Sequence, residues 1–392
     1  MMNPNRKLKA IACNSFLGLA LGLLTGPDAG AQTVWSKLTE QPFAAPGSSV
    51  DYRPDQPLYQ LAAGYGKAIF AADKAGLHRS ADGELSWSLA DATGFAMSNA
   101  LAADASGLVL FNKRISRDGG LTWKDLPESI GILPTAFAIR NGMVFTGGYY
   151  NHVNGSLDTA KTFKRMRTGP DVAWPTALEI TEKSCIYLGL YSGGTFLSED
   201  QGKTWSNHKG IVRSETEYGL IPAGAERMTS LRVAAGGDLI AGYFGMNGAP
   251  GTPGLFRISP DLKTSAAAEG GFPKIGVTAL VRGPSGVLFA GTWGMGVYRS
   301  ADAGKTWAAL NPGLEGRHIL ALEINSGATL FAVTREGAFS MAKAEGAPAA
   351  LWRNNLTNGK ASRRAAVLEQ LLDPARSRMR LDGRHLVTRR LP

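Results

Sequence analysis

The segment Ser300-Ala301-Asp302-Ala303-Gly304-Lys305-Thr306-Trp307 decides the fold of this chain, because its pattern recurs along the sequence. Written as S-x-D-x-G-x-T-W, the pattern is matched in full twice more, from Ser116 to Trp123 and from Ser198 to Trp205. Two weaker copies run from Ser80 to Trp87 and from Ser156 to Phe163. Recurrence of an eight-residue motif indicates one structural unit copied several times.

The spacing of the copies indicates the size of that unit. Their aspartates are Asp82, Asp118, Asp158, Asp200, Asp302 and, in a worn copy, Asp261. Successive separations of 36, 40, 42, 61 and 41 residues fit the roughly 40–45 residues of a four-stranded propeller blade, with one enlarged repeat. Ser340 and the later Trp352 are the candidates for a seventh copy.

Each repeat is predicted to contain four short strands. In the sixth, the strands are expected at 277–281, 287–290, 296–300 and 307–310, separated by turns that contain Gly or Asp. Matching inner strands are expected to begin near Leu58, Leu101, Thr135, Thr176, Leu231, Val277 and Ile319. The sequence therefore predicts an all-β fold, a seven-bladed β-propeller over residues 32–357. The segment 35–38 is expected to pair with the last blade and close the ring.

The repeated motif has a structural rationale. Its Asp can accept hydrogen bonds from turn amides, its Gly tolerates positive φ, and its Trp can fill the space between neighbouring blades. We therefore assign a structural and not a catalytic role to a set of motif residues, namely Asp82, Asp118, Asp158, Asp200, Asp302, Trp87, Trp123, Trp205 and Trp307.

These repeats resemble those of the Asp-box, or BNR, propellers, over roughly residues 33–357. That family contains sialidases, xyloglucan-cleaving glycoside hydrolases, sortilin-type receptors, and photosystem II stability and assembly factors. A single seven-bladed ring behind a signal peptide is most similar to the last group and its bacterial relatives. The resemblance implies a role in binding or assembly, but it does not by itself decide function.

A hydrolase is the alternative that the resemblance leaves open. A sialidase should carry a Phe/Tyr-Arg-Ile-Pro motif, and Tyr52-Arg53-Pro54 lacks the Ile. A glycoside hydrolase needs two carboxylates facing each other across a cleft. The candidates, all in loops between blades, are Asp171, Glu217 and Glu226, with Glu215 beside them. Ordinary solvated surface charge is the competing interpretation of these residues.

Aromatic residues are concentrated in loops that should share the face opposite the motif turns. They follow the second strands of repeats three to six and are Tyr149, Tyr150, Tyr191, Tyr243, Phe244 and Trp293. Aromatic rings backed by glycines suit either a protein hot spot or carbohydrate stacking. The competing interpretation is that some of the rings only fill gaps between blades. We expect a protein partner, or a carbohydrate, on this aromatic face.

The N-terminus has the features of a signal peptide at residues 1–31. Arg6, Lys7 and Lys9 precede nine apolar residues at 16–24, and Ala29-Gly30-Ala31 offers a cleavage site. Nine apolar residues are too few to span a bilayer, which needs roughly 20. The sequence therefore predicts export to the periplasm or beyond the cell.

The formal net charge of +10 is carried mainly outside the repeats. Residues 1–31 contribute +2 and residues 358–392 contribute +6, which leaves +2 for the predicted ring. A nearly neutral body gives no reason to expect nucleic-acid binding. The tail 358–392 pairs a short predicted helix with an arginine-rich end. It could dock on an anionic membrane surface or an acidic partner, or be a solvated tail.

No cofactor or metal is expected. The five histidines are scattered, and no Gly-rich phosphate loop joins a strand to a helix. After cleavage only Cys185 remains, so no internal disulfide is expected. The sequence thus favours an exported, non-catalytic propeller that binds a protein partner, with a glycoside hydrolase, sialidase-like or glucan-cleaving, as the alternative.

Overall fold

A computed structural model of the chain describes the following residues: 36–37, 60–73, 76–82, 87–92, 100–127, 130, 134–148, 152–166, 175–191, 194–207, 228–244, 253–268, 270–314 and 316–346. All of them belong to the compact unit Thr33–Pro392. The predicted signal peptide at 1–31 and the tail at 358–392 lie outside the described residues, so the domain boundaries stay predictions. Within the described residues, no helix is both long and apolar enough to cross a membrane.

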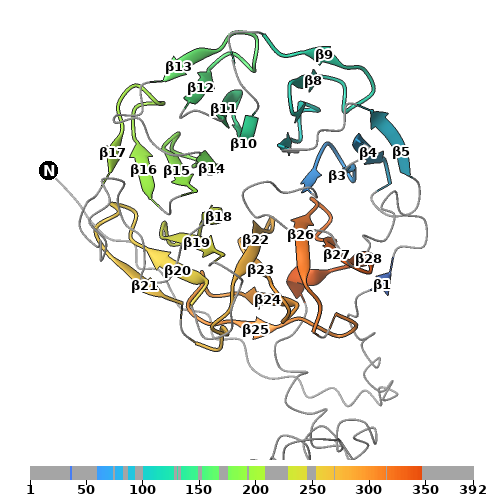
Figure 1. Cartoon of the computed structure of the whole chain (residues 1–392), viewed down its shortest axis with the longest axis vertical. Coiled ribbons are helices and arrows are strands. Elements are labelled where there is room, and N and C mark those ends of the chain that lie inside the picture. The colour runs from blue at the N-terminus through green and yellow to red at the C-terminus, as the bar shows by residue number, and fades with distance from the viewer. Residues whose placement is uncertain are drawn as a thin grey trace, which may run out of the picture. The chain divides into compact units, whose positions relative to one another are not determined.

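Seven four-stranded antiparallel sheets form the blades of a β-propeller, arranged around a ring in Figure 1. Blade one contains β2 (Gln60–Ala63), β3 (Ile69–Asp73), β4 (Gly76–Ser80) and β5 (Trp87–Asp91). Blade two contains β6 (Leu101–Ala103), β7 (Val109–Phe111), β8 (Arg114–Ser116) and β9 (Lys124–Asp125). Blade three contains β10 (Pro134–Arg140), β11 (Met143–Gly148), β12 (His152–Ser156) and β13 (Lys164–Met166).

The remaining blades repeat this order. Blade four contains β14 (Pro175–Ile180), β15 (Ile186–Leu190), β16 (Thr195–Ser198) and β17 (Ser206–Asn207). Blade five contains β18 (Met228–Val233), β19 (Leu239–Tyr243), β20 (Leu255–Ile258) and β21 (Ser265–Ala267). Blade six contains β22 (Val277–Arg282), β23 (Leu288–Thr292), β24 (Val297–Ser300) and β25 (Ala308–Ala309). The prediction of a seven-bladed propeller is confirmed.

Blade seven is completed by the other end of the chain. Its first three strands are β26 (Ile319–Ile324), β27 (Leu330–Thr334) and β28 (Gly337–Met341). The fourth is β1 (Ser36–Lys37), where Ser36 pairs with Ser340 and Lys37 with Phe339. The outer strand predicted from residues 35–38 therefore closes the ring, as expected. This pairing covers a sheet edge that would otherwise be exposed.

The motif turns join the third and fourth strands, and their geometry explains the residue pattern. In blade two, the Ser116 hydroxyl donates to Asp118 Oδ1 at 2.7 Å and accepts from the Gly120 amide at 2.8 Å. Asp118 also accepts from the Thr122 amide at 2.9 Å and the Thr122 hydroxyl at 2.5 Å. These hydrogen bonds, led by that of the Thr122 hydroxyl, hold the pKa of Asp118 well below its usual range. The turn aspartates are thus ionised acceptors within their own turns.

The motif turns that the structure describes pack on the preceding blade. Trp205 of blade four belongs to a cluster with Phe145 of blade three, and Trp307 of blade six to one with Ile240 of blade five. Trp87 of blade one packs against strands of blade seven, which joins the two ends of the ring. The structural role predicted for these tryptophans follows from this arrangement, because each ring buries a large apolar surface between two blades.

Hydrogen bonds between inner strands also join neighbouring blades. The hydroxyl of Thr135 donates to the Pro175 carbonyl at 2.5 Å, and that of Thr176 to the Met228 carbonyl at 2.7 Å. The Thr229 hydroxyl donates in the same way to the Val277 carbonyl of the next blade, at 2.9 Å. One Thr near the start of consecutive inner strands thus fixes the spacing of blades three to six around the central channel.

Candidate functional site

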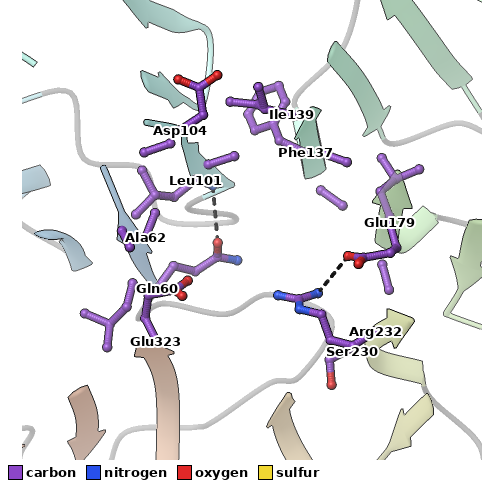
Figure 2. A pocket seen from close by; sticks show the side chains of 18 of the residues that line it. Gln60, Ala62, Leu101, Asp104, Phe137, Ile139, Glu179, Ser230, Arg232 and Glu323 are labelled. Carbon is purple, nitrogen blue, oxygen red and sulfur yellow. Dashed lines mark hydrogen bonds and ion pairs between the residues drawn. The ribbon is translucent and has the colours of Figure 1, made fainter. Parts of the chain in front are cut away.

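All seven blades line a central channel. It is a cavity of about 880 Å³, lined by the inner strands β2, β6, β10, β14, β18, β22 and β26. Along each inner strand, alternate side chains point into the channel and into the packed blades. Channel-facing residues at equivalent positions of different inner strands therefore lie at one height and form a layer. Figure 2 shows the side chains of 18 of the residues that line this cavity.

Three charged side chains occupy one layer of the channel. Glu179 of β14, Arg232 of β18 and Glu323 of β26 pair with Tyr187, Ile240 and Phe331, respectively, which places them at the same height. Arg232 Nη1 lies 3.7 Å from Glu179 Oε2 (Figure 2).

Glu323 lies apart from this pair, on β26. Its Oε1 accepts a hydrogen bond from the Ile324 amide at 2.9 Å. Burial raises the pKa of Glu323 to about 7, although the Ile324 amide and the charge of Arg232 favour the ionised form. Figure 2 places it beside Gln60, across the channel from Glu179. The channel therefore holds one carboxylate paired with an arginine and one carboxyl group that exchanges its proton near neutral pH.

Sequence reasoning missed these three channel residues. A signal was present, because Glu179, Arg232 and Glu323 are each the fifth residue of a six-residue, largely apolar inner strand. Aligning the inner strands by repeat would have placed the three at equivalent positions. What the alignment could not show is their distance across the ring.

The aromatic face is partly described, and one group of it forms a contact cluster. We call Phe244, Trp293, His318 and Arg335 the Trp293 cluster. The Phe244 and Trp293 rings meet edge to face at 5.4 Å, and the His318 ring lies 4.3 Å from that of Trp293. The Arg335 guanidinium lies 5.0 Å from the centre of the Trp293 ring.

The strand order puts this cluster on the face opposite the motif turns. Phe244 and Trp293 follow second strands, Arg335 lies between β27 and β28, and His318 precedes the inner strand β26. The cluster joins blades five, six and seven. Burial, and secondarily the charge of Arg335, lowers the pKa of His318. Met295, two residues after Trp293, is 43% exposed.

The other predicted aromatic residues have different surroundings. Tyr243 is fully buried and meets Phe256 edge to face at 5.4 Å. Phe244 is also largely buried, whereas Tyr191 is half-buried. The ring of Tyr243 therefore packs in the cluster between blades four and five and is closed to solvent in this structure, as the gap-filling interpretation expects. Tyr149 and Tyr150 lie outside the described residues.

The carboxylates predicted for a hydrolase are not described either. Asp171, Glu215, Glu217 and Glu226 fall outside the described residues, so their spacing stays untested. Within the part of the chain that the structure describes, no three His, Cys, Asp or Glu side chains gather in a way that could hold a metal ion. Cys185 is a free, half-buried thiol.

Comparison with known proteins supports the fold alone. No protein-family model and no curated protein sequence matches the chain. Among solved structures, YCF48 from Cyanidioschyzon merolae aligns over 80% of this chain and 99% of its own, with 12% identity and a TM-score of 0.54. YCF48 bound to D1 peptide aligns over 78% of this chain and 99% of its own, with 13% identity and a TM-score of 0.53.

A carbohydrate-active enzyme has a structure that is similar to this chain to the same degree. The GH74 xyloglucanase from Xanthomonas campestris aligns over 79% of this chain and 53% of its own, with 17% identity and a TM-score of 0.53. Fold and channel together define this chain as a seven-bladed β-propeller. Identities of 12 to 17% show that shared architecture and leave the choice between binding and hydrolysis to the residues of this chain.

Proposed function

We propose that the chain is an exported, non-catalytic propeller that binds a protein partner through the face that carries the Trp293 cluster. The observation that carries the proposal is the contact of Trp293 with Arg335, together with the exposed side chain of Met295 two residues further along the chain from Trp293. Tryptophan, arginine and methionine are enriched in protein interfaces, and Trp and Arg in their hot spots. The cluster also rests on three blades, so its side chains are held before a partner arrives.

Two further observations support a binding role. The motif turns, with their Ser-Asp-Thr hydrogen bonds, favour membership of the Asp-box propellers, whose single-ring members similar to photosystem II assembly factors act in binding. One solved propeller of the same fold is YCF48 in complex with a D1 peptide. For this chain we likewise propose a protein partner.

Photo-crosslinking in cells tests the proposal. A photoreactive amino acid at position 295 should give a discrete crosslinked product with an envelope protein. The matched control is position 89, because Leu89 is also an exposed apolar residue, at 54%, but lies on the outer strand β5. Adding Trp293→Ala or Arg335→Ala should reduce the product at least tenfold without unfolding the ring. Equal products from positions 295 and 89 would reject the Trp293 cluster as the interface.

Export is part of the same proposal. The charge pattern and the Ala29-Gly30-Ala31 sequence support cleavage after residue 31. Intact-mass measurement of the protein from the envelope fraction should find an N-terminus at Gln32. A chain that keeps Met1 and stays in the cytoplasm would contradict this. The basic tail at 358–392 is proposed to contact an anionic membrane surface or an acidic partner, and removing it should release the protein from that fraction.

A glycoside hydrolase is the second candidate, favoured by the two carboxyl groups in the channel. Glu179 is held near Arg232 and Glu323 has a raised pKa, which are the different environments that a base or nucleophile and a general acid require. Turnover of aryl glycosides or xyloglucan, lost in Glu323→Gln or Glu179→Gln, would support it. The loop carboxylates Asp171, Glu217 and Glu226 need the same test, with Glu182→Gln as the control. No turnover by the purified protein would reject this candidate.

A further inference from the structure

Two arginines from non-adjacent blades reach the ends of two neighbouring inner strands. Arg140 is the last residue of β10 in blade three, and its Nε donates at 2.8 Å to the carbonyl of Ile180, the last residue of β14 in blade four. Arg282 is the last residue of β22 in blade six, and its Nη1 donates at 3.2 Å to the carbonyl of Val233, the last residue of β18 in blade five. Because blades four and five are neighbours, the two guanidinium groups lean toward each other from opposite sides.

A third arginine lies on the strand that Arg282 contacts. Arg232 of β18 donates through Nη1 to the Leu231 carbonyl at 2.7 Å, and the same Nη1 lies 3.7 Å from Glu179 Oε2 (Figure 2). We call Arg140, Arg232 and Arg282 the arginine arc. Among the described residues, Glu179 is the one carboxylate within ion-pair distance of the arc, so three guanidinium groups and one carboxylate leave a net charge of +2.

The two outer members of the arginine arc lack an acidic partner. Within the part of the chain that the structure describes, neither Arg140 nor Arg282 has a carboxylate within ion-pair distance, and each has one hydrogen bond, to a backbone carbonyl. All three arginines of the arc are half-buried. A guanidinium group that has lost part of its hydration is stabilised by a carboxylate or phosphate, which can accept two of its N–H groups at once. The arc therefore offers unused donors to an anion.

The arginine arc lies where two cavities meet. The central channel of about 880 Å³ and a second cavity of about 1200 Å³ share three lining residues, namely Arg140, Glu179 and Arg282. Hairpins that join first and second strands form much of the wall of the second cavity. Such a hairpin lies against the motif turn of its own blade, as where the Thr159 amide donates to the Gly142 carbonyl at 2.8 Å. The arc is therefore at the mouth of the channel on the motif-turn face, opposite the Trp293 cluster.

The other carboxyl groups of the channel do not neutralise the arginine arc. Asp104, on blade two, accepts hydrogen bonds from the Ser106 amide at 2.8 Å and the Ser106 hydroxyl at 2.6 Å within its own hairpin. Glu323, on blade seven, has a pKa that burial raises to about 7, so it is partly uncharged at neutral pH. Neither group therefore occupies the donors of the arc.

The acidic residues of the second cavity are also separate from the arginine arc. Glu182 and Glu199 are exposed, and water screens the charge of an exposed carboxylate. Glu182 precedes Lys183 in an exposed hairpin, and Asp261 Oδ2 lies 3.2 Å from Lys263 Nζ. The half-buried positive charge of the arc is therefore the main electrostatic feature at the inner end of this cavity.

We propose that the arginine arc binds a small organic anion, whose carboxylate or phosphate group is held between Arg140 and Arg282. A small molecule fits this position because the arc is half-buried at the meeting point of two cavities, and small ligands bind in concave sites of several hundred Å³. The hairpins at the mouth contain Ala235-Gly236-Gly237 and Gly283, whose small side chains leave the entrance open. This site lies beyond the proposed function, which uses the opposite face of the ring.

Isothermal titration calorimetry on the full-length protein, at fixed ionic strength, tests the proposal. The probes are citrate and glycerol phosphate, with glycerol as the neutral control. We expect saturable binding of at least one anion and none of glycerol, and the stronger of the two anions distinguishes a carboxylate ligand from a phosphate ligand. Arg140→Gln or Arg282→Gln should weaken binding at least tenfold, because each removes a charged donor group. Arg165→Gln, at an exposed arginine of the outer strand β13, should leave binding unchanged.

Glu179→Gln gives a result that a purely structural role of the arginine arc would not give. Removing the carboxylate beside the arc should strengthen anion binding at least threefold, because it takes away the repulsion of the ligand. Trp293→Ala, on the other face, should leave anion binding unchanged, so this proposal and the proposed protein interface can fail separately. Circular dichroism of each variant checks that the ring stays folded.

Four outcomes would overturn the proposal. They are no saturable binding of either anion, equal binding by the wild type and Arg140→Gln or Arg282→Gln, binding of glycerol as strong as that of the anions, and a loss of affinity in Glu179→Gln. Binding of an acidic peptide such as hexa-aspartate without binding of either small anion would also overturn it, since that result assigns the arc to a protein partner.

Discussion

Replacing Gly202 by alanine tests how the turns pack on the preceding blade. Gly202 has φ of +87°, and a Cβ there would lie 2.8 Å from Cε1 of Phe145 and 3.3 Å from Cγ of Met166. The left-handed backbone costs an alanine about 1 kcal/mol, and overpacking costs about 1–3 kcal/mol. Reduced freedom of the unfolded chain returns about 0.5 kcal/mol. We expect Gly202→Ala to lower the free energy of unfolding by about 1.5–3.5 kcal/mol.

The matched control and the rescue come from the same fold. Gly119 has φ of +73° with no atom near its would-be Cβ, so Gly119→Ala should cost only the backbone strain of about 1 kcal/mol less the same return of about 0.5 kcal/mol, a net loss of about 0.5 kcal/mol. In blade three the equivalent residue is already Ala160, at φ of +59°, in a cluster with the smaller Leu110 of blade two. Phe145→Leu should therefore relieve Gly202→Ala by about 1 kcal/mol in a double-mutant cycle.

The assay is urea unfolding followed by far-ultraviolet circular dichroism, with the four proteins of the cycle and Gly119→Ala measured side by side. If Gly202→Ala is no less stable than Gly119→Ala, the contact with Phe145 does not restrict the turn and the reasoning fails. Additive effects of Gly202→Ala and Phe145→Leu would refute the same contact independently.

Three other perturbations have defined outcomes. Thr176→Val removes the hydrogen bond to the Met228 carbonyl and should lower the unfolding free energy by about 1 kcal/mol, measured in urea, whereas no loss would show that the bond contributes nothing net. Folding raises the pKa of Glu323, so its contribution to stability is complete below about pH 4.5 and is lost as the pH rises through about 7. Glu323→Gln should therefore flatten the curve of unfolding free energy against pH over this range, by on the order of 2 kcal/mol. An unchanged curve would contradict the raised pKa. Deleting residues 33–38 removes β1 from β28 and should lower the melting temperature and cause concentration-dependent association, seen by light scattering, while an unchanged monomer would show that the edge needs no cover.

The spacing of the motif was enough to predict the number of blades, because each copy of the turn specifies its own hydrogen bonds. Ser116, Asp118, Gly120 and Thr122 lie within seven residues, so the geometry they require is local. Strand order within a blade is equally local, since each strand pairs with its neighbour in sequence. Even the role of residues 35–38 could be predicted. They resemble an outer strand that has no blade of its own, and the last blade offers an open edge with which such a strand can pair.

The site depended on contacts that no local pattern contains. Glu179, Arg232 and Glu323 come from blades four, five and seven, and only closure of the ring brings them into one channel. The second strand of each blade is buried on both faces, so its sequence does not tell a core ring such as Tyr243 from one that meets solvent. Local hydrogen bonds therefore determined the blades, and long-range packing between blades decided where a ligand can bind.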